Sequence, residues 1–134
     1  MVIESTIKTR DSIPLCCAYG FDRANEDQIK SVVNGCGTGG WKSRLVPDTM
    51  YGLFIGEACD IHDWDYEYGE TNEEKERADR AFRNNLLRLV DARTDRGWIG
   101  QHIILPMRRR RCQIYFEVVY HFGGPAFWDG KARP

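Results

Sequence analysis

The stretch Cys59-Asp60-Ile61-His62-Asp63-Trp64-Asp65-Tyr66 places a histidine next to an aspartate, with a tyrosine one helical turn later. It follows the glycine-rich stretch Gly35-Cys36-Gly37-Thr38-Gly39-Gly40 by about twenty residues. Neighbouring side chains on a helix point about 100° apart, so His62 can act as a base while Asp63 binds a metal ion. The pattern predicts a functional site rather than an ordinary core helix.

The first helix around this site is predicted from helical spacing. Pro47-Asp48-Thr49 marks its start and Gly69 its end, and the apolar stripe between them includes Ile55, Cys59, His62 and Tyr66. A second helix opens at the capping-box pair Thr71 and Glu74 and runs to about Ala92. Its inward stripe is Asp79, Phe82, Leu86 and Leu89.

His62 and Asp79 therefore lie on the apolar faces of consecutive helices, where an unpaired charge is costly. Each lies about 10 Å from the connecting turn at 1.5 Å rise per residue, so in an antiparallel pair they face one another. An Asp79 that accepts from His62 Nδ1–H would leave Nε2 as the base. Tyr66 can donate its hydroxyl to the same carboxylate.

The remaining elements are less sharply patterned. Residues 2–9 and 13–21 are short segments, either β-prone or irregular. A short helix is predicted over 24–34, with Asp22 or Asn25 as N-cap and Gly35 at its end. After Pro106, Cys112, Tyr115 and Val119 favour a last helix, although the β-branched and aromatic content favours a strand. We expect a helix that packs on the catalytic pair, in a single mostly α domain over residues 1–134.

Composition excludes several classes. The net charge is −1, which favours neither nucleic acid nor an acidic partner surface, although ten carboxylates lie over 57–79 and ten arginines over 77–111. There is no apolar run near the ~20 residues of a membrane span, and residues 1–9 lack the pattern of a signal peptide. The expectation is a soluble protein whose compartment stays open.

The glycine-rich stretch predicts a cation site. Glycines 35, 37, 39 and 40 permit positive φ angles that aim several backbone carbonyls at one point. Asp63 points away from the apolar stripe and can add a carboxylate. Ligands that are all oxygen suit calcium.

Together these motifs resemble calcium-dependent phospholipase A2: the glycine loop, then Val46-Pro47-Asp48, then Cys59-x-x-His62-Asp63-x-x-Tyr66, then Asp79. The resemblance covers about residues 34–92. It implies a phospholipase A2-like fold in which the carbonyls of Gly35, Gly37 and Gly39, with Asp63, hold Ca²⁺. It also implies that His62, supported by Asp79 and Tyr66, activates water against the sn-2 ester of a phospholipid, while Ca²⁺ and the Gly37 N–H stabilise the oxyanion.

The chain departs from the family at its cysteines. Where secreted members carry cysteines in the active-site helix and just before the supporting aspartate, this chain has Asp65 and Ala78. One family bridge, Cys36 to Cys59, is implied if the compartment is oxidising. The chain is therefore more similar to prokaryotic or viral members, and the amphipathic N-terminal helix that docks on lipid is not evident.

Other interpretations stay open. A non-catalytic structural protein, such as a virion or secretion component, would keep His62 and Asp79 as a buried pair and calcium as a staple. Zinc on Cys59, His62 and Cys16-Cys17 lacks the spacing of common zinc modules. Nucleotide binding is disfavoured because no P-loop Lys-Ser/Thr pair follows the glycines.

Two surface features have alternative readings. The run Arg108 to Arg111 is typical of a solvated helix end, but it can also bind an anion such as a lipid phosphate or nucleic acid. Trp41 and the tail Phe127-Trp128 favour core packing over contact with an acyl chain or a membrane surface.

Overall fold

The computed structural model describes residues 2–33 and 49–132, and this part of the chain is mostly helical with two small antiparallel sheets. The elements are β1 (Glu4–Lys8), β2 (Pro14–Ala18), η1 (Phe21–Arg23), α1 (Glu26–Val32), β3 (Thr49–Met50), β4 (Leu53–Phe54), α2 (Gly56–Tyr68), α3 (Asn72–Arg93), the π-helix η3 (Gly100–Ile104), α4 (Leu105–Phe122) and α5 (Gly124–Trp128).

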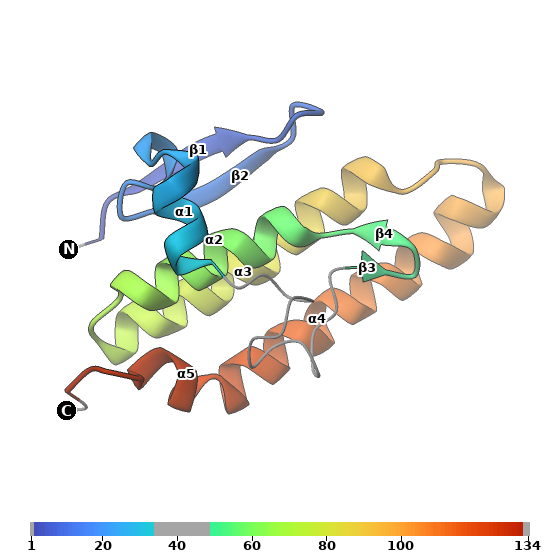
Figure 1. Ribbon diagram of the computed structural model, residues 1–134. Helices are drawn as coiled ribbons and strands as arrows, with labels where there is room; N and C mark the ends of the chain where they lie inside the picture. Colours follow the sequence, from blue (N-terminus) through green and yellow to red (C-terminus); the bar gives the residue numbers. More distant parts are fainter. Residues whose placement is uncertain (1, 34–48, 133–134) are drawn as a thin grey trace.

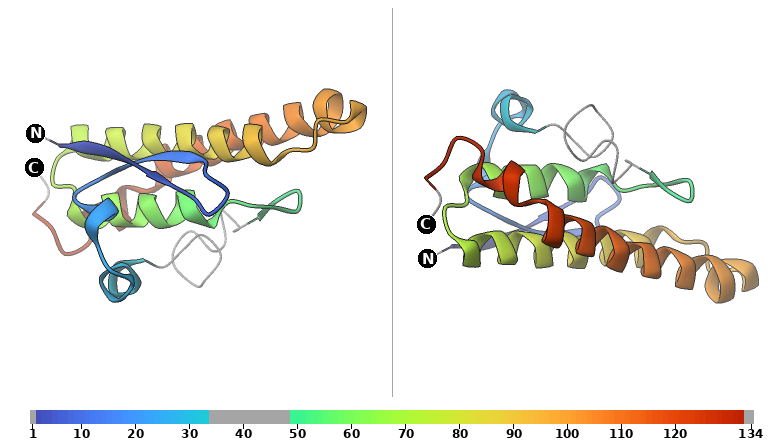
Figure 2. Two further views of the ribbon diagram at one scale, coloured as in Figure 1. Left: turned by 90° about the horizontal axis from the view of Figure 1, so that it is seen from above. Right: turned by 90° about the horizontal axis from the view of Figure 1, so that it is seen from below.

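The helices and the first hairpin stack in layers (Figure 1). Helices α2 and α3 run antiparallel side by side, the hairpin β1–β2 covers one face of this pair, and α4 crosses the other face (Figures 1 and 2). Side chains from every layer meet in one core, including Leu15 of β2, Ile61 of α2, Phe82 and Leu86 of α3, and Val119 of α4. The α2–α3 pair is thus enclosed on both sides.

The predicted N-terminal strands are confirmed as the antiparallel pair β1 and β2. Strand β2 buries Leu15 and Cys17 completely against the helices. A side chain from α3 extends the pairing, because the Asn85 amide accepts from Cys16 N–H and donates to Cys16 C=O, both at 2.9 Å. Asn85 thereby satisfies backbone groups at the edge of the sheet, as a neighbouring strand would.

The short helix α1 is confirmed, with Asn25 as its N-cap. Asn25 and Gln28 form a reciprocal capping box, in which each side chain accepts from the other residue's backbone N–H. The helix ends at Val32, earlier than the predicted end at Gly35. Gly35 itself lies outside the described residues.

The predicted start of the site-bearing helix at residues 47–49 is wrong: α2 begins at Gly56. A two-residue hairpin, β3–β4, occupies the positions before it, with Thr49 opposite Phe54. Its loop residues Tyr51 and Gly52 both have positive φ angles, 49° and 80°. Two such residues form the primed turn that matches strand twist, and this local turn overrides the helix signal of Pro47.

Helix α3 begins where the sequence predicts, with Thr71 accepting from Glu74 N–H at 3.1 Å. The predicted inward stripe is confirmed, since Asp79, Phe82, Leu86 and Leu89 are all buried. The C-terminal segment is the helix α4, and the strand alternative is wrong. Its residues Cys112, Tyr115 and Val119 are buried at helical spacing, with Pro106 in the first turn, where its missing N–H costs nothing.

None of the helices in residues 2–33 and 49–132 combines the length and the apolar character that crossing a bilayer requires.

Candidate active site

The structure brings the two predicted partners together: His62 of α2 and Asp79 of α3 are joined through Nε2 and Oδ1 at 2.8 Å. Both side chains are fully buried. The antiparallel packing of α2 and α3 produces this contact, because each residue lies at a similar distance from the turn between the helices. The prediction that they satisfy one another is confirmed.

The ring nitrogen in this contact differs from the predicted one. Asp79 faces Nε2, the ring nitrogen farther from the backbone, and not Nδ1. The imidazole also lies flat against the Phe82 ring, with centroids 4.6 Å apart and an interplanar angle of 26°. A proton taken from water by this histidine would therefore go to Nδ1. The two ring nitrogens thus exchange the predicted roles: Nε2 contacts the carboxylate, and Nδ1 is the candidate base.

Tyr66 lies one helical turn after His62 and donates its hydroxyl to the same Asp79 oxygen at 2.7 Å. The His62 and Tyr66 ring centroids lie 4.2 Å apart. Burial, with the adjacent Asp79 charge and hydrogen bond, raises the pKa of Tyr66 far above its usual value. Tyr66 therefore stays protonated, and the predicted hydrogen bond from its hydroxyl to Asp79 is confirmed.

Lys75 completes the Asp79 environment and is absent from the predicted set. Its ammonium donates to Asp79 Oδ2 at 2.7 Å and to the Val119 and Tyr120 carbonyls, both at 3.3 Å. These carbonyls belong to the last turn of α4, where helix C-termini attract cations. The sequence signal was available, because Lys75 and Asp79 have the i, i+4 spacing of a helical ion pair.

The balance of these contacts fixes the charge of Asp79. Burial raises the pKa of this carboxyl, but hydrogen bonds and charge from His62, with the hydrogen bonds from Lys75 and Tyr66, outweigh it and hold the pKa below its usual value. Asp79 is thus ionised at neutral pH although its side chain is 0% exposed. A carboxylate in this state can orient an imidazole and stabilise the imidazolium.

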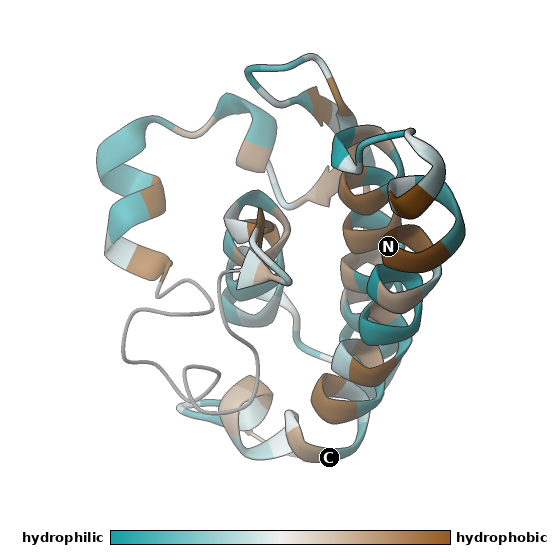
Figure 3. Ribbon diagram, turned by 90° about the vertical axis from the view of Figure 1, so that its right-hand side faces the viewer, coloured by the Kyte–Doolittle hydropathy of each residue, from teal (hydrophilic) through white to brown (hydrophobic). Residues whose placement is uncertain are grey.

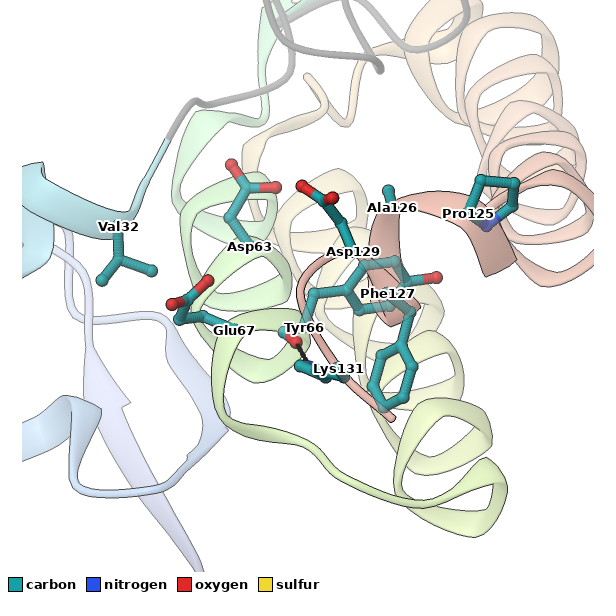
Figure 4. A pocket seen from close by; sticks show the side chains of 9 residues that line it. All are labelled: Val32, Asp63, Tyr66, Glu67, Pro125, Ala126, Phe127, Asp129 and Lys131. Atoms are coloured by element: carbon teal, nitrogen blue, oxygen red, sulfur yellow. Dashed lines mark hydrogen bonds between the residues drawn. The ribbon is translucent and has the colours of Figure 1, made fainter. Parts of the chain in front are cut away.

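Asp63, the predicted metal ligand, is half-buried beside this cluster. It lines a pocket of about 410 Å³ together with Tyr66, Glu67, Phe127 and Asp129. In Figure 4 the carboxylates of Asp63 and Asp129 both extend toward the upper part of this pocket. Asp129, from the tail after α5, was not predicted, and no spacing in the sequence indicates it.

The other predicted calcium ligands, Gly35, Gly37 and Gly39, lie outside the described residues, as does the proposed oxyanion donor at Gly37. Within residues 2–33 and 49–132, no three His, Cys, Asp or Glu side chains group as a metal site. The expected site would draw a single side-chain ligand from this part, Asp63. A half-buried carboxylate at a pocket is a suitable donor for calcium, which prefers oxygen ligands.

Of the four cysteines in the described part of the chain, one is in a disulfide and three are thiols. Cys59 is disulfide-bonded, while Cys16, Cys17 and Cys112 are free; the implied partner, Cys36, lies outside the described residues. The disulfide removes Cys59 as a thiolate ligand, so the zinc alternative gains no support. At the two positions where the family's other cysteines would stand, Asp65 instead forms an ion pair with Arg77 at 2.5 Å, and Ala78 is buried.

Most of the arginine run has partners within the chain. Arg108 donates to the Tyr51 carbonyl at 2.7 Å, Arg109 to Asp91 at 2.9 Å, and Arg111 to the Tyr51 hydroxyl at 3.0 Å. Among the tryptophans, Trp64 and Trp128 are buried, whereas Trp98 is 71% exposed; Trp41 lies outside the described residues. Phe127 and Trp128 therefore pack in the core.

Neither a protein-family model, nor a curated protein, nor a solved structure matches this chain.

Proposed function

We propose that the chain is a calcium-dependent, phospholipase A2-like hydrolase that cleaves the sn-2 ester of phospholipids with water activated by His62. The observation that carries the proposal is the buried contact between His62 Nε2 and Asp79, with Tyr66 on the same carboxylate oxygen. Asp63, the next residue in the chain, faces a pocket. The candidate base His62 and the candidate metal ligand Asp63 thus lie side by side on α2, and the orienting carboxylate of Asp79 faces them from α3.

In the proposed mechanism His62 Nδ1 accepts a proton from water as the oxygen attacks the ester carbonyl, and it returns the proton to the leaving alcohol. Asp79 holds the imidazole through Nε2 and stabilises its positive charge. Tyr66 and Lys75 fix Asp79 from two further directions. Because water attacks directly, no covalent acyl-enzyme forms.

Calcium would be held by Asp63 and by the carbonyls of Gly35, Gly37 and Gly39. It would supply Lewis-acid stabilisation of the negative charge that develops on the carbonyl oxygen.

A second candidate function is a non-catalytic structural or interaction protein in which the same residues form a stabilising buried cluster. The observation that favours it is that the side chain of His62 is 0% exposed. Lys75 also pairs with Asp79, so the buried carboxylate has a cationic partner whether or not His62 takes part in a reaction. Both candidates are compatible with calcium binding, so only turnover separates them.

The test is release of sn-2 fatty acid from mixed phospholipid vesicles and from a short-chain monomeric ester, with Ca²⁺ or with a chelator. Removal of a general base costs about 10²–10⁴-fold in rate, so His62→Gln should lose almost all turnover. His121→Gln is the matched control, because this histidine is exposed on α4. Asp63→Asn should lose both turnover and the calcium-induced rise in melting temperature.

Calcium-dependent release that His62→Gln abolishes and His121→Gln retains would support the hydrolase. Circular dichroism checks that each variant is folded. Absence of release from every substrate, in folded protein that calcium still stabilises, would refute the hydrolase and favour the structural candidate.

A further inference from the structure

The connection between α3 and α4 exposes a group of large apolar side chains. Trp98 is 71% exposed, Ile99 61%, Ile103 46% and Met107 43%. We call residues 94–111 the helical tip; it contains η3 and the first turns of α4. Figure 3 looks at this end of the molecule and shows brown, hydrophobic residues on turns near the viewer. A group of this kind marks an interaction surface more often than scattered single residues do.

The helical tip is also strongly basic. It contains five arginines, Arg96 and Arg108 to Arg111, and a single acidic residue, Asp95, so its formal charge is 5 − 1 = +4 in a chain of net charge −1. Of the contacts described, only that of Arg109 with Asp91 is to a carboxylate, whereas Arg108 and Arg111 contact neutral oxygens of Thr94 and Tyr51. Among residues 2–33 and 49–132, carboxylates therefore compensate little of this positive charge.

Exposed tryptophan and isoleucine beside arginine match the two components of an anionic lipid surface. Tryptophan is favoured at the boundary between head groups and acyl chains. Each basic residue near an anionic leaflet adds an attraction of about 1 kcal/mol, which is about fivefold in affinity. If the helical tips of two copies of this chain met, two surfaces with a formal charge of +4 each would repel one another, which disfavours self-association here.

We propose that the helical tip docks this protein on anionic lipid bilayers, with Trp98, Ile99 and Ile103 entering the head-group region and the arginines facing lipid phosphates. The inference deepens the proposed function, on which it rests for its biological purpose, because it names the part of the chain that meets the lipid. Residues 4–18, by contrast, form the β1–β2 hairpin rather than an amphipathic helix.

The tip acts as a tether. Asp79 and Arg93 are separated by fourteen residues of α3, about 21 Å at 1.5 Å per residue, so the tip lies well away from the His62 cluster. Docking through the helical tip keeps the protein at the lipid surface and leaves the His62–Asp79 pair free of lipid contact. Changes in the tip should therefore raise the apparent KM for vesicles and leave the rate on a monomeric ester unchanged.

The test is co-sedimentation of the full chain with phosphatidylcholine vesicles, with and without phosphatidylglycerol, in chelator so that hydrolysis does not intervene. We expect binding to the anionic vesicles and a loss of about tenfold or more for Trp98→Ser combined with Ile103→Ser. Arg110→Gln should lose about fivefold. The fluorescence of Trp98 should shift to shorter wavelength on binding in the native chain.

Matched controls lie elsewhere on the surface. Phe122→Ser combined with Ile3→Ser removes side chains that are 68% and 80% exposed but lie outside the tip. Arg80→Gln removes an exposed arginine from the middle of α3. These variants should keep binding within about twofold.

Equal loss in the tip and control variants, or equal binding to neutral and anionic vesicles, would overturn the proposal. So would a concentration-dependent dimer that only the tip variants dissolve, without vesicle binding. Because the binding assay contains no hydrolysis step, the two proposals fail separately. Binding without fatty-acid release refutes the hydrolase alone, and release without tip-dependent binding refutes the tether alone.

Discussion

Replacing Lys75 by methionine tests whether the Asp79 cluster is organised as a network around one buried charge. The methionine keeps much of the side-chain volume but removes the ammonium that lies 2.7 Å from Asp79 Oδ2. The Asp79 side chain is 0% exposed and that of Lys75 is 11% exposed, so water cannot replace the lost donor. The carboxylate would keep its contacts with His62 and Tyr66.

Breaking a buried pair by removing one partner typically costs 3–5 kcal/mol. The two remaining donors on Asp79 place the expected loss at the lower end, about 3 kcal/mol at neutral pH. Arg80→Met is the matched control on the same helix, since Arg80 and Glu76 also have i, i+4 spacing. Their side chains are 58% and 44% exposed and lie 3.4 Å apart, so the control should lose about 0.5 kcal/mol or less.

The assay is urea unfolding at neutral pH, with Trp64 and Trp128 as buried fluorescent probes. The double variant Lys75→Met with Asp79→Asn should be less destabilised than the sum of the single variants, because no carboxylate charge is then buried without the Lys75 ammonium. If Lys75→Met lost stability within 1 kcal/mol of the Arg80→Met control, or if the single effects were additive, Asp79 would not be the centre of such a network.

The same network sets a pH dependence. The pKa of Asp79 in the folded state lies below its unfolded value, so its stabilisation is fully present above about pH 4 and is lost as the pH falls through the folded-state pKa. Lys75→Met removes one group that lowers this pKa. The acid side of its stability curve should therefore move to higher pH than in the native chain.

Three further predictions concern other parts of the core. Arg77→Met should cost about 3 kcal/mol of unfolding free energy, because it removes the guanidinium that lies 2.5 Å from the Asp65 carboxylate, whose side chain is 0% exposed. Asp65→Asn should cost less, and urea unfolding of both variants measures the difference. Gly123→Ala should cost about 1–3 kcal/mol, because its methyl group would overlap the Tyr66 hydroxyl, and a smaller cost in a Tyr66→Phe background is required. Burial raises the pKa of the Cys112 thiol to about 12, so native protein at pH 8 should leave this cysteine unmodified by a disulfide reagent, and rapid labelling would contradict its packing.

Much of the helical framework follows from local signals. Thr71 with Glu74, and Asn25 with Gln28, satisfy the first backbone N–H groups of their helices, so short-range hydrogen bonds fix where α3 and α1 begin. The stripe of Asp79, Phe82 and Leu86 fixes which face of α3 is buried. The predicted start of α2 was wrong because another local preference, that of Tyr51 and Gly52 for a tight turn, competes with the helix signal.

The pairing of His62 with Asp79 was predictable because both depend on helical period and on one short turn. The residues that refine the site were not predictable in this way. Asp129 reaches the Asp63 pocket from a tail more than sixty residues later, and the position of that tail depends on Phe127 packing against Tyr66 with ring centroids 5.2 Å apart.

Helical spacing and capping patterns along the chain are enough to predict α1, α3 and α4, the buried face of α3 and the facing of His62 with Asp79. The packing of α2 against α3 sets which imidazole nitrogen faces Asp79, with Nε2 and Oδ1 2.8 Å apart. The tertiary structure also decided that Lys75 reaches both Asp79 and the carbonyls at the end of α4. Local backbone preferences act over a few residues and can be read along the chain, whereas ring orientation and charge pairing depend on which surfaces the packed helices bring within 3–4 Å.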